Sequence, residues 1–205
     1  MDQGADSVMV LSPYYFSLSN ASIEYFYDMV AEGCKGKIYL YNFPDRTGYS
    51  IPPQVVLNLV RKHSNIVGIK DSSGSFSNTR DYITAVLPEF PEFEVFSGFD
   101  DNFVHCLASG GAGCIGGLSN LVPEWCGAWV AAAEKEDQAD LYKIQKNIDR
   151  LMALYSVGKP FIPAVKKAMV LRGILNNDRS SVPFLPSTEE ETEQIRTIMR
   201  SAGIL

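Results

Sequence analysis

The stretch IVGIKDSSG, residues 66–74, decides the fold class of this chain. It begins with a short apolar run that ends on Lys70. A strand that is apolar on both faces is typical of a parallel sheet covered by helices. Because α/β folds bind ligands at the carboxyl ends of parallel strands, the stretch predicts an α/β fold with a ligand site beside Lys70.

Similar apolar runs recur on both sides of this stretch. They are SVMVLSPYY (7–15), KIYLYN (37–42), FEVFSG (93–98) and AGCIGG (112–117). The first four runs of the chain start about thirty residues apart, which is the length of a βα unit. Segments with helical spacing separate them, at residues 23–33, 52–63 and 79–87. On spacing alone, the chain fits either an open doubly wound sheet or part of a barrel.

After AGCIGG the sequence predicts helices only. The expected helical segments are residues 123–158, with an amphipathic piece at 137–155, a helix from Pro160 to about Gly173, and a last helix ending near Ser201. Ser187 and Glu190 have the spacing of a capping box, which predicts where the last helix begins. Residues 176–186, NNDRSSVPFLP, predict a loop.

The beginning of the chain predicts an incomplete barrel. Gly4 followed by Ala-Asp and a strand is typical of the end of a helix, so we expect the chain to begin in mid-fold. Five strands do not close an eight-stranded barrel. We therefore expect residues 1–122 to form a partial (β/α) barrel, and residues 123–205 to form its last helix and a C-terminal helical region.

The composition excludes several classes of function. Hydrophobic residues make up 46% of the 205 residues, charged residues make up 20%, and the formal net charge is −6. An acidic, evenly mixed surface argues against nucleic acid or an anionic membrane as the main partner. No apolar run approaches the roughly 20 residues that span a bilayer, and the opening residues MDQGAD are not a signal peptide. We therefore expect a cytoplasmic protein.

The cysteines, histidines and glycines predict neither a metal site nor a phosphate loop. The four cysteines have no CxxC or other metal spacing, which is typical of free thiols in a reducing cytosol. His63 and His105 lie in predicted helices beside apolar residues, so we expect both to be structural or solvated. The run GGAGCIGG lacks the spacing and the Lys-Ser/Thr pair of a phosphate-binding loop.

Lys70 and Tyr41 form the candidate catalytic pair. Apolar surroundings lower the pKa of a lysine side chain. A larger fraction of it is then the neutral amine, which can attack a carbonyl. Tyr41 ends the preceding predicted strand, and neighbouring parallel strands lie about 4.8 Å apart, so both side chains can face one cavity. A phenol beside an amine can transfer protons in such a reaction. The alternatives are a lysine that reaches solvent or pairs with Asp71, and a tyrosine that only packs.

Arg46 and two glycine-rich turns extend the candidate site. Arg46 lies in the loop PDRTG (44–48) beside the end of the same strand, and arginine binds a carboxylate through two parallel hydrogen bonds. An ordinary surface loop is the alternative for this residue. Gly98 in FSGFDD and the glycines around Ile115 mark strand ends where the backbone approaches another group closely.

Five motifs, PYYF, YNFPDRTG, IVGIKDSSG, FSGFDD and GCIGGLSN, together resemble the dihydrodipicolinate synthase / N-acetylneuraminate lyase family. The resemblance runs from about Gly4 to the C-terminus. It implies a (β/α)8 TIM barrel, here from the fourth strand to the eighth, with extra C-terminal helices. It also implies a homo-oligomer, usually a tetramer, that needs no metal or organic cofactor and binds pyruvate and a small aldehyde or 2-keto acid.

The resemblance also implies roles for individual residues. Lys70 matches the lysine that forms a Schiff base with pyruvate, and Tyr41 matches the tyrosine of the Y-N-x-P motif. Tyr15 matches a second tyrosine that completes a proton relay across a dimer interface in the synthases. Arg46 matches the arginine that binds the carboxylate of the acceptor aldehyde. Backbone atoms near Gly98 and Ile115 are expected to line the site.

The sequence departs from the family in two ways. It contains no Gly-Thr/Ser-Thr-Gly-Glu stretch, whose amides hold the pyruvate carboxylate in the family, and it has Phe16 where the synthases usually have Asn. With Phe16, the sequence is similar at this position to the aldolases that cleave 2-keto-3-deoxy sugar acids. Arg46 instead favours a 4-hydroxy-tetrahydrodipicolinate synthase-like reaction. Cleavage of N-acetylneuraminate or of a hydroxy-oxoglutarate is a further alternative.

A truncated, non-catalytic family member is the alternative of another class. A partial barrel leaves an apolar interior half open and a strand edge unpaired at each end. On this reading the isolated chain is poorly stable and has little or no lyase activity, although Lys70 and Tyr41 remain adjacent.

Overall fold

The computed structural model of the protein describes residues 4–205, which form two compact units. The first unit ends at Ile115, and the second runs from Gly116 to Leu205. Residues 1–3, with which the predicted partial barrel and the opening MDQGAD begin, lie outside the described residues. The division into residues 1–122 and 123–205 stays a prediction.

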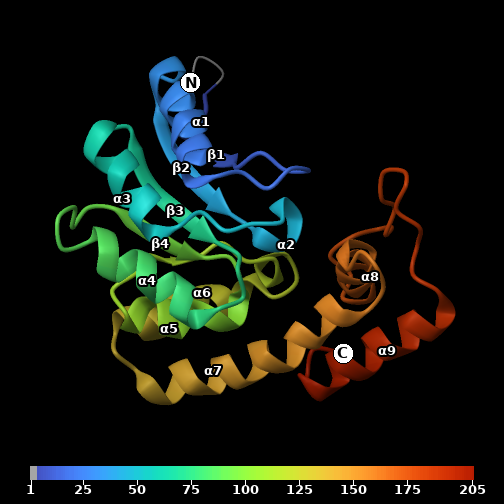
Figure 1. Cartoon of the computed structure of the whole chain (residues 1–205). Helices are drawn as coiled ribbons and strands as arrows, with labels where there is room; N and C mark the ends of the chain where they lie inside the picture. The colour runs from blue at the N-terminus through green and yellow to red at the C-terminus, as the bar shows by residue number, and fades with distance from the viewer. Residues whose placement is uncertain (1–3) are drawn as a thin grey trace. The chain divides into compact units, whose positions relative to one another are not determined.

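A parallel sheet of five strands forms the centre of the first unit, and its strands follow one another in chain order (Figure 1). They are β1 (Ser7–Leu11), β2 (Lys37–Asn42), β3 (Ile66–Asp71), β4 (Glu94–Ser97) and β5 (Gly113–Cys114). The α/β class predicted from the apolar runs is confirmed. The doubly wound alternative is wrong, because it requires a point where the strand order reverses.

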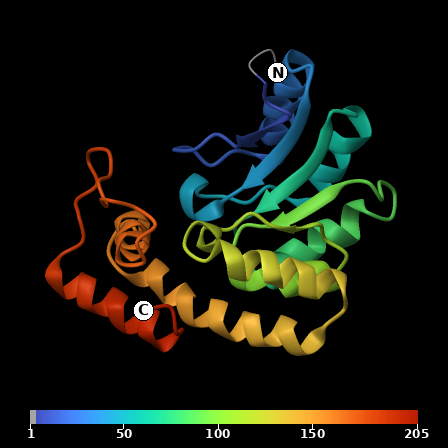
Figure 2. The ribbon, with the colours of Figure 1, turned by 180° about the vertical axis from the view of Figure 1, so that it is seen from behind.

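Helices connect the strands of this unit. They are α1 (Asn20–Gly33), α2 (Pro44–Thr47), α3 (Pro53–Lys62), α4 (Phe76–Val86) and α5 (Phe103–Ala108), with a 3-10 turn, η1 (Asp100–Asn102), before α5. Figure 1 shows α1, α3 and α4 in succession beside the sheet, and Figure 2 shows the same arrangement from behind. Serine side chains begin two of these helices: Ser19 accepts from the Ser22 amide, and Ser75 from the Asn78 amide.

The first strand is shorter than the predicted run of residues 7–15. It ends at Leu11, and Pro13 and Tyr15 follow in a loop. Proline has no amide hydrogen for a ladder, and Tyr15 has a φ of 83°, which an extended strand does not allow. The apolar residues of this run therefore serve two purposes, a strand up to Leu11 and an exposed loop after it.

The core of the first unit lies between the sheet and its helices. Ile38, Leu40, Ile69 and Val95 come from three strands, and their side chains are fully buried. Tyr82 of α4 is also fully buried, and its hydroxyl donates to the Ile51 carbonyl. Burial raises the pKa of this phenol well above its ordinary value, so the hydroxyl stays a hydrogen-bond donor.

A buried carboxylate fixes the carboxyl end of β3. Asp71 is 2% exposed, and its two oxygens accept hydrogen bonds from four side chains. The donors are Asn42 at 2.8 Å, Ser73 at 3.0 Å, Asn78 at 3.0 Å and Thr79 at 2.7 Å. These bonds tie β3 to β2 and α4. Both carboxylate oxygens of Asp71 accept these hydrogen bonds, and no ion pair joins Asp71 to Lys70 among the described residues. The alternative that Asp71 pairs with Lys70 is therefore wrong.

The second unit is helical, as the sequence predicts. Its elements are α6 (Pro123–Glu134), α7 (Gln138–Leu151), α8 (Ile162–Leu171) and α9 (Glu189–Ser201), with 3-10 turns η2 (Leu118–Asn120) and η3 (Met152–Ser156). The predicted helical segment 123–158 is divided at Glu136, which has a φ of 56°. Asp137 then caps α7 by accepting from the Asp140 amide, so a new helix begins there.

The capping box of the last helix lies one residue later than predicted. Thr188, not Ser187, accepts from the Glu191 amide at 3.1 Å, and the Glu191 carboxylate accepts from the Thr188 amide at 2.8 Å. Both Ser187 and Thr188 have a glutamate three residues on, so the pattern fits either register. No helix within residues 4–205 is long and apolar enough to cross a membrane.

We expect Asp71→Asn to lower the free energy of unfolding by about 2–4 kcal/mol. The substitution replaces one carboxylate oxygen by an NH2 group, which cannot accept the hydrogen bonds of the buried donors around it. Urea denaturation followed by circular dichroism measures this loss. The matched control is Asp81→Asn on α4, whose carboxylate is exposed and whose loss should cost under about 0.5 kcal/mol. Equal stabilities for the two variants would contradict a structural role for the Asp71 cluster.

Candidate active site

Lys70 and Tyr41 lie side by side on one face of the sheet. Their Cα atoms are register partners of β3 and β2, and the Lys70 ammonium nitrogen lies 4.6 Å from the centre of the Tyr41 ring. Both side chains are partly buried. Lys70 takes part in no ion pair among the described residues, and its ammonium makes a cation–π contact with the face of this ring. The structure brings the predicted catalytic pair together.

A register shift between the two strands produces this pairing. Ile38 pairs with Ile66, but Tyr39 pairs with Gly68, so β3 has one extra residue at this point. A one-residue shift moves a whole strand's side chains to the other face. The shift therefore places Tyr41 and Lys70 on the same face of the sheet.

Ser72 lies beside the Tyr41 hydroxyl, and Gly98 lies against Ser72. Ser72 is 3% exposed, and its hydroxyl oxygen lies 3.5 Å from that of Tyr41, at the limit of a hydrogen bond. The Gly98 amide donates to the Asp71 carbonyl at 2.7 Å. A Cβ atom at position 98 would lie 1.8 Å from the Ser72 hydroxyl oxygen. Glycine is required here because two strand ends meet, as the FSGFDD motif predicts.

Ile115 follows β5 at the same end of the sheet. Its amide donates to the Ser97 carbonyl at 2.8 Å, and its side chain is 37% exposed. Gly98 and Ile115 thus both lie at the carboxyl ends of strands, as Lys70 and Tyr41 do. Their predicted contact with a substrate stays a prediction.

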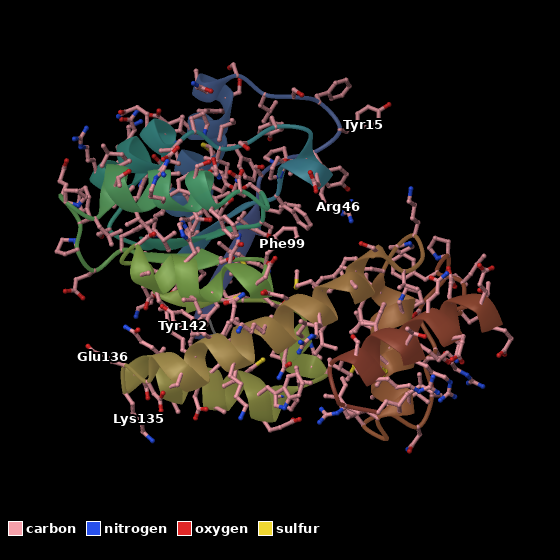
Figure 3. All side chains as sticks on the ribbon, turned by 90° about the horizontal axis from the view of Figure 1, so that it is seen from below. Tyr15, Arg46, Phe99, Lys135, Glu136 and Tyr142 are labelled. Atoms are coloured by element: carbon pink, nitrogen blue, oxygen red, sulfur yellow. The ribbon has the colours of Figure 1, made fainter. Side chains whose placement is uncertain are left out.

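Arg46 projects from α2, the short helix that follows β2 (Figure 3). Its guanidinium carbon lies 5.3 Å from the centre of the Phe43 ring, and the Phe43 ring stacks on Tyr41 at 5.7 Å. Arg46 is exposed and, within residues 4–205, has no carboxylate partner. A free guanidinium beside a strand end can bind an incoming carboxylate.

Tyr15 lies apart from Lys70 and Tyr41, the predicted catalytic pair. Its side chain is 86% exposed on the loop after β1, and its ring contacts Phe16 edge to face at 4.8 Å (Figure 3). In the part of the chain that the structure describes, it makes no ring contact or hydrogen bond with Lys70 or Tyr41. The structure therefore does not bring Tyr15 to the site within one chain.

A tyrosine–glutamate pair lies one layer below Lys70. Tyr39, Gly68 and Glu94 are neighbours across β2, β3 and β4, on the same face as Lys70. The Tyr39 hydroxyl donates a hydrogen bond to the Glu94 carboxylate. A Cβ at Gly68 would lie 2.5 Å from the Tyr39 ring, so the ring crosses β3 at the glycine. Burial and the Glu94 carboxylate raise the pKa of Tyr39 to about 12.

Four further neighbours of Lys70 and Tyr41 were not predicted from the sequence: Tyr39, Phe43, Ser72 and Glu94. Alternation along YLYNF could have placed Tyr39, Tyr41 and Phe43 on one side of the chain.

No group of three or more His, Cys, Asp or Glu side chains could hold a metal ion among residues 4–205. A cavity of about 630 Å³ lies in the second unit, between η3 and α9, and none of the predicted site residues lines it.

Comparisons with known proteins agree with the fold and with the motifs. The sequence profile of the dihydrodipicolinate synthetase family matches residues 1–202. The chain is 31% identical over 202 residues to the probable 2-dehydro-3-deoxy-D-pentonate aldolase YjhH of Escherichia coli, covering 98% of the chain and 67% of that protein. It is 32% identical over 202 residues to the 4-hydroxy-tetrahydrodipicolinate synthase of Kosmotoga olearia, covering 98% of the chain and 68% of that protein.

A solved structure has the same fold. The crystal structure of YagE from Escherichia coli, in complex with pyruvate, superimposes with a TM-score of 0.95 at 30% identity, covering 100% of the chain and 68% of YagE. This likeness confirms the predicted fold class, part of a (β/α)8 TIM barrel. The chain spans about two thirds of the length of the relatives that it matches.

Glu94→Gln should lower the pKa of Tyr39 from about 12 while leaving it above that of a free phenol, because burial remains. The phenolate absorbance of Tyr39, taken as the difference between each protein and its Tyr39→Phe variant, measures the shift in an alkaline titration. The matched control is Glu92→Gln, which removes an exposed carboxylate two residues earlier. A Tyr39 pKa unchanged by Glu94→Gln would mean that burial alone holds the phenol protonated.

Proposed function

The chain belongs to the dihydrodipicolinate synthetase family, and from this premise we propose that it is a pyruvate-dependent aldolase in which Lys70 forms a Schiff base. The observation that carries the proposal is the Lys70 nitrogen held 4.6 Å above the Tyr41 ring, at the carboxyl ends of adjacent parallel strands. The pyruvate bound to the related YagE supports the choice of keto acid.

The proposed reaction begins with the neutral amine of Lys70. The nitrogen attacks the ketone carbon of pyruvate, and the ketone oxygen takes up a proton to give a carbinolamine. Loss of water gives the imine, and loss of a proton from the methyl carbon gives an enamine. The enamine carbon attacks the carbonyl carbon of an aldehyde, and water then releases the product from Lys70. Cleavage of a 2-keto acid is the same sequence in reverse.

Tyr41 is the proposed proton carrier for these steps. Its hydroxyl lies on the ring that the Lys70 nitrogen contacts, and the Ser72 hydroxyl lies 3.5 Å from it. The Tyr41 hydroxyl can therefore carry a proton between the Lys70 amine and the ketone oxygen of pyruvate, so no base has to diffuse in from solvent. The proposal gives Tyr15 a role in this relay only if a second copy of the chain supplies it, and its 86% exposure supports that arrangement.

Arg46 supports a synthase-like acceptor, an aldehyde that carries a carboxylate. Its guanidinium has no protein carboxylate to bind within residues 4–205, and a bidentate pair with a substrate would satisfy it. Cleavage of a 2-keto-3-deoxy sugar acid is the second candidate, and both the relative YjhH and Phe16 favour it. A homotetramer in the cytoplasm completes the proposal.

The rival proposal is a family member without catalytic activity. Covalent trapping separates the two. Borohydride reduces an imine to a stable amine, so an active site gains a mass that an inactive one does not.

Borohydride with pyruvate should add one reduced pyruvate to the chain at Lys70 alone, and Lys70→Arg should abolish the adduct, because a guanidinium does not form the imine at useful rates. Intact mass and peptide mapping measure both results. Lys62→Arg, which changes an exposed lysine on α3, is the matched control and should keep the adduct. An adduct that persists in Lys70→Arg would exclude Lys70 as the nucleophile.

Arg46→Ala should lower kcat/KM for an aldehyde that carries a carboxylate by roughly 30–150-fold, the worth of a charge-assisted bidentate pair. Trapping of pyruvate on Lys70 should change little, because that step precedes the acceptor. Arg80→Ala, on the exposed face of α4, is the matched control. Equal losses in trapping and in turnover would show that Arg46 is structural, and the synthase-like acceptor would lose its main support.

A further inference from the structure

Phe43 lies between two cation-bearing parts of the candidate site. Its ring stacks on Tyr41, with 5.7 Å between ring centres and 28° between ring planes. The Arg46 guanidinium carbon lies 5.3 Å from the centre of the same Phe43 ring. The Lys70 ammonium lies over Tyr41 in turn. Two aromatic rings thus connect the nucleophile to the arginine.

The backbone of this turn is held firmly. The Phe43 carbonyl accepts from the Arg46 amide at 2.9 Å, from the Thr47 amide at 3.0 Å and from the Thr47 hydroxyl at 3.1 Å. Gly48 ends the turn with a φ of 84°, which suits glycine. The position of the Arg46 Cα is therefore fixed relative to Phe43 by bonds that involve neither the Arg46 nor the Phe43 side chain.

The Arg46 side chain has no such restraint from polar groups. Within residues 4–205 it forms no ion pair or side-chain hydrogen bond, and its guanidinium lies over the Phe43 ring. An exposed arginine loses considerable conformational freedom when it binds an anion. A platform that holds the guanidinium beforehand reduces this loss and leaves the five N–H donors free.

From these contacts we infer that Phe43 is a positioning residue, which acts through Arg46 and selects for acceptors that carry a carboxylate. The inference rests on the proposed function, because it assigns Arg46 to the acceptor. Phe43 itself makes no polar contact with the acceptor in this scheme. Its ring holds the guanidinium at the strand end beside Tyr41, so the carboxylate enters at a fixed distance from the nucleophile.

A double-mutant cycle between Phe43→Leu and Arg46→Ala tests this coupling, with succinic semialdehyde as the charged acceptor and butanal as its uncharged counterpart. Phe43→Leu should lower kcat/KM for succinic semialdehyde by about 2- to 5-fold and leave butanal unchanged. In the Arg46→Ala background, the same substitution should have no further effect. Phe43→Tyr, which keeps the ring, should restore the wild-type value.

Phe76→Leu is the matched control, because Phe76 is a half-exposed phenylalanine on α4 whose ring contacts His105. It should leave both acceptors unchanged. Equal losses for the two acceptors in Phe43→Leu, or a loss that persists in the Arg46→Ala background, would overturn the inference. Either result would mean that Phe43 acts on the substrate or on the fold without Arg46.

The proton resonances of Arg46 give a readout that needs no turnover. A guanidinium stacked on a ring places the neighbouring δ protons in the ring current, so they should shift upfield in the wild-type chain. Phe43→Leu should abolish the shift, and Phe43→Tyr should keep it. If pyruvate is not trapped on Lys70, the proposed function fails, and this spectrum still decides whether Phe43 positions Arg46. Unshifted protons in the wild-type chain would overturn the inference.

Discussion

Ile38 of β2 pairs with Ile66 of β3, whereas Tyr39 pairs with Gly68, so β3 carries Val67 as an extra residue between these pairs. Without it, Tyr41 would lie beside Ile69, and Lys70 would point to the opposite face of the sheet. With it, the phenol and the amine share a face at the same strand end. The proposed chemistry therefore depends on a backbone irregularity at Val67, three residues before the proposed nucleophile.

Consecutive residues of β3 then serve the two sides of the sheet. Lys70 faces the open side, with Tyr39, Gly68 and Glu94 in the layer below it, while Asp71 faces the helices and accepts four side-chain hydrogen bonds. The buried carboxylate holds the strand end, and the lysine beside it forms no ion pair with any residue from 4 to 205. Asp71 thus stabilises the strand end, while its neighbour Lys70 is left for the proposed reaction.

The residues alone were sufficient for the strands and the Lys70–Tyr41 pair, because apolar runs ending in polar residues mark strand ends. The sequential order of the strands followed only from the family resemblance, because their spacing also fits a doubly wound sheet. The sequence was insufficient where geometry depends on backbone detail. The end of β1 depends on the φ of Tyr15, the division of residues 123–158 on the φ of Glu136, and the capping box on two equivalent registers. The contact of Phe43 with Arg46 depends on a four-residue helix that has no periodicity to detect.

The strand order has a consequence for how the first unit forms during synthesis. Each strand from β2 to β5 pairs with the strand made just before it, and the four contacts to Asp71 come from residues no more than 29 positions away. A nascent chain can therefore add one βα unit at a time to a growing sheet, without waiting for a distant segment to emerge from the ribosome. The same locality means that Lys70 and Tyr41 can meet before any of the second unit has been translated.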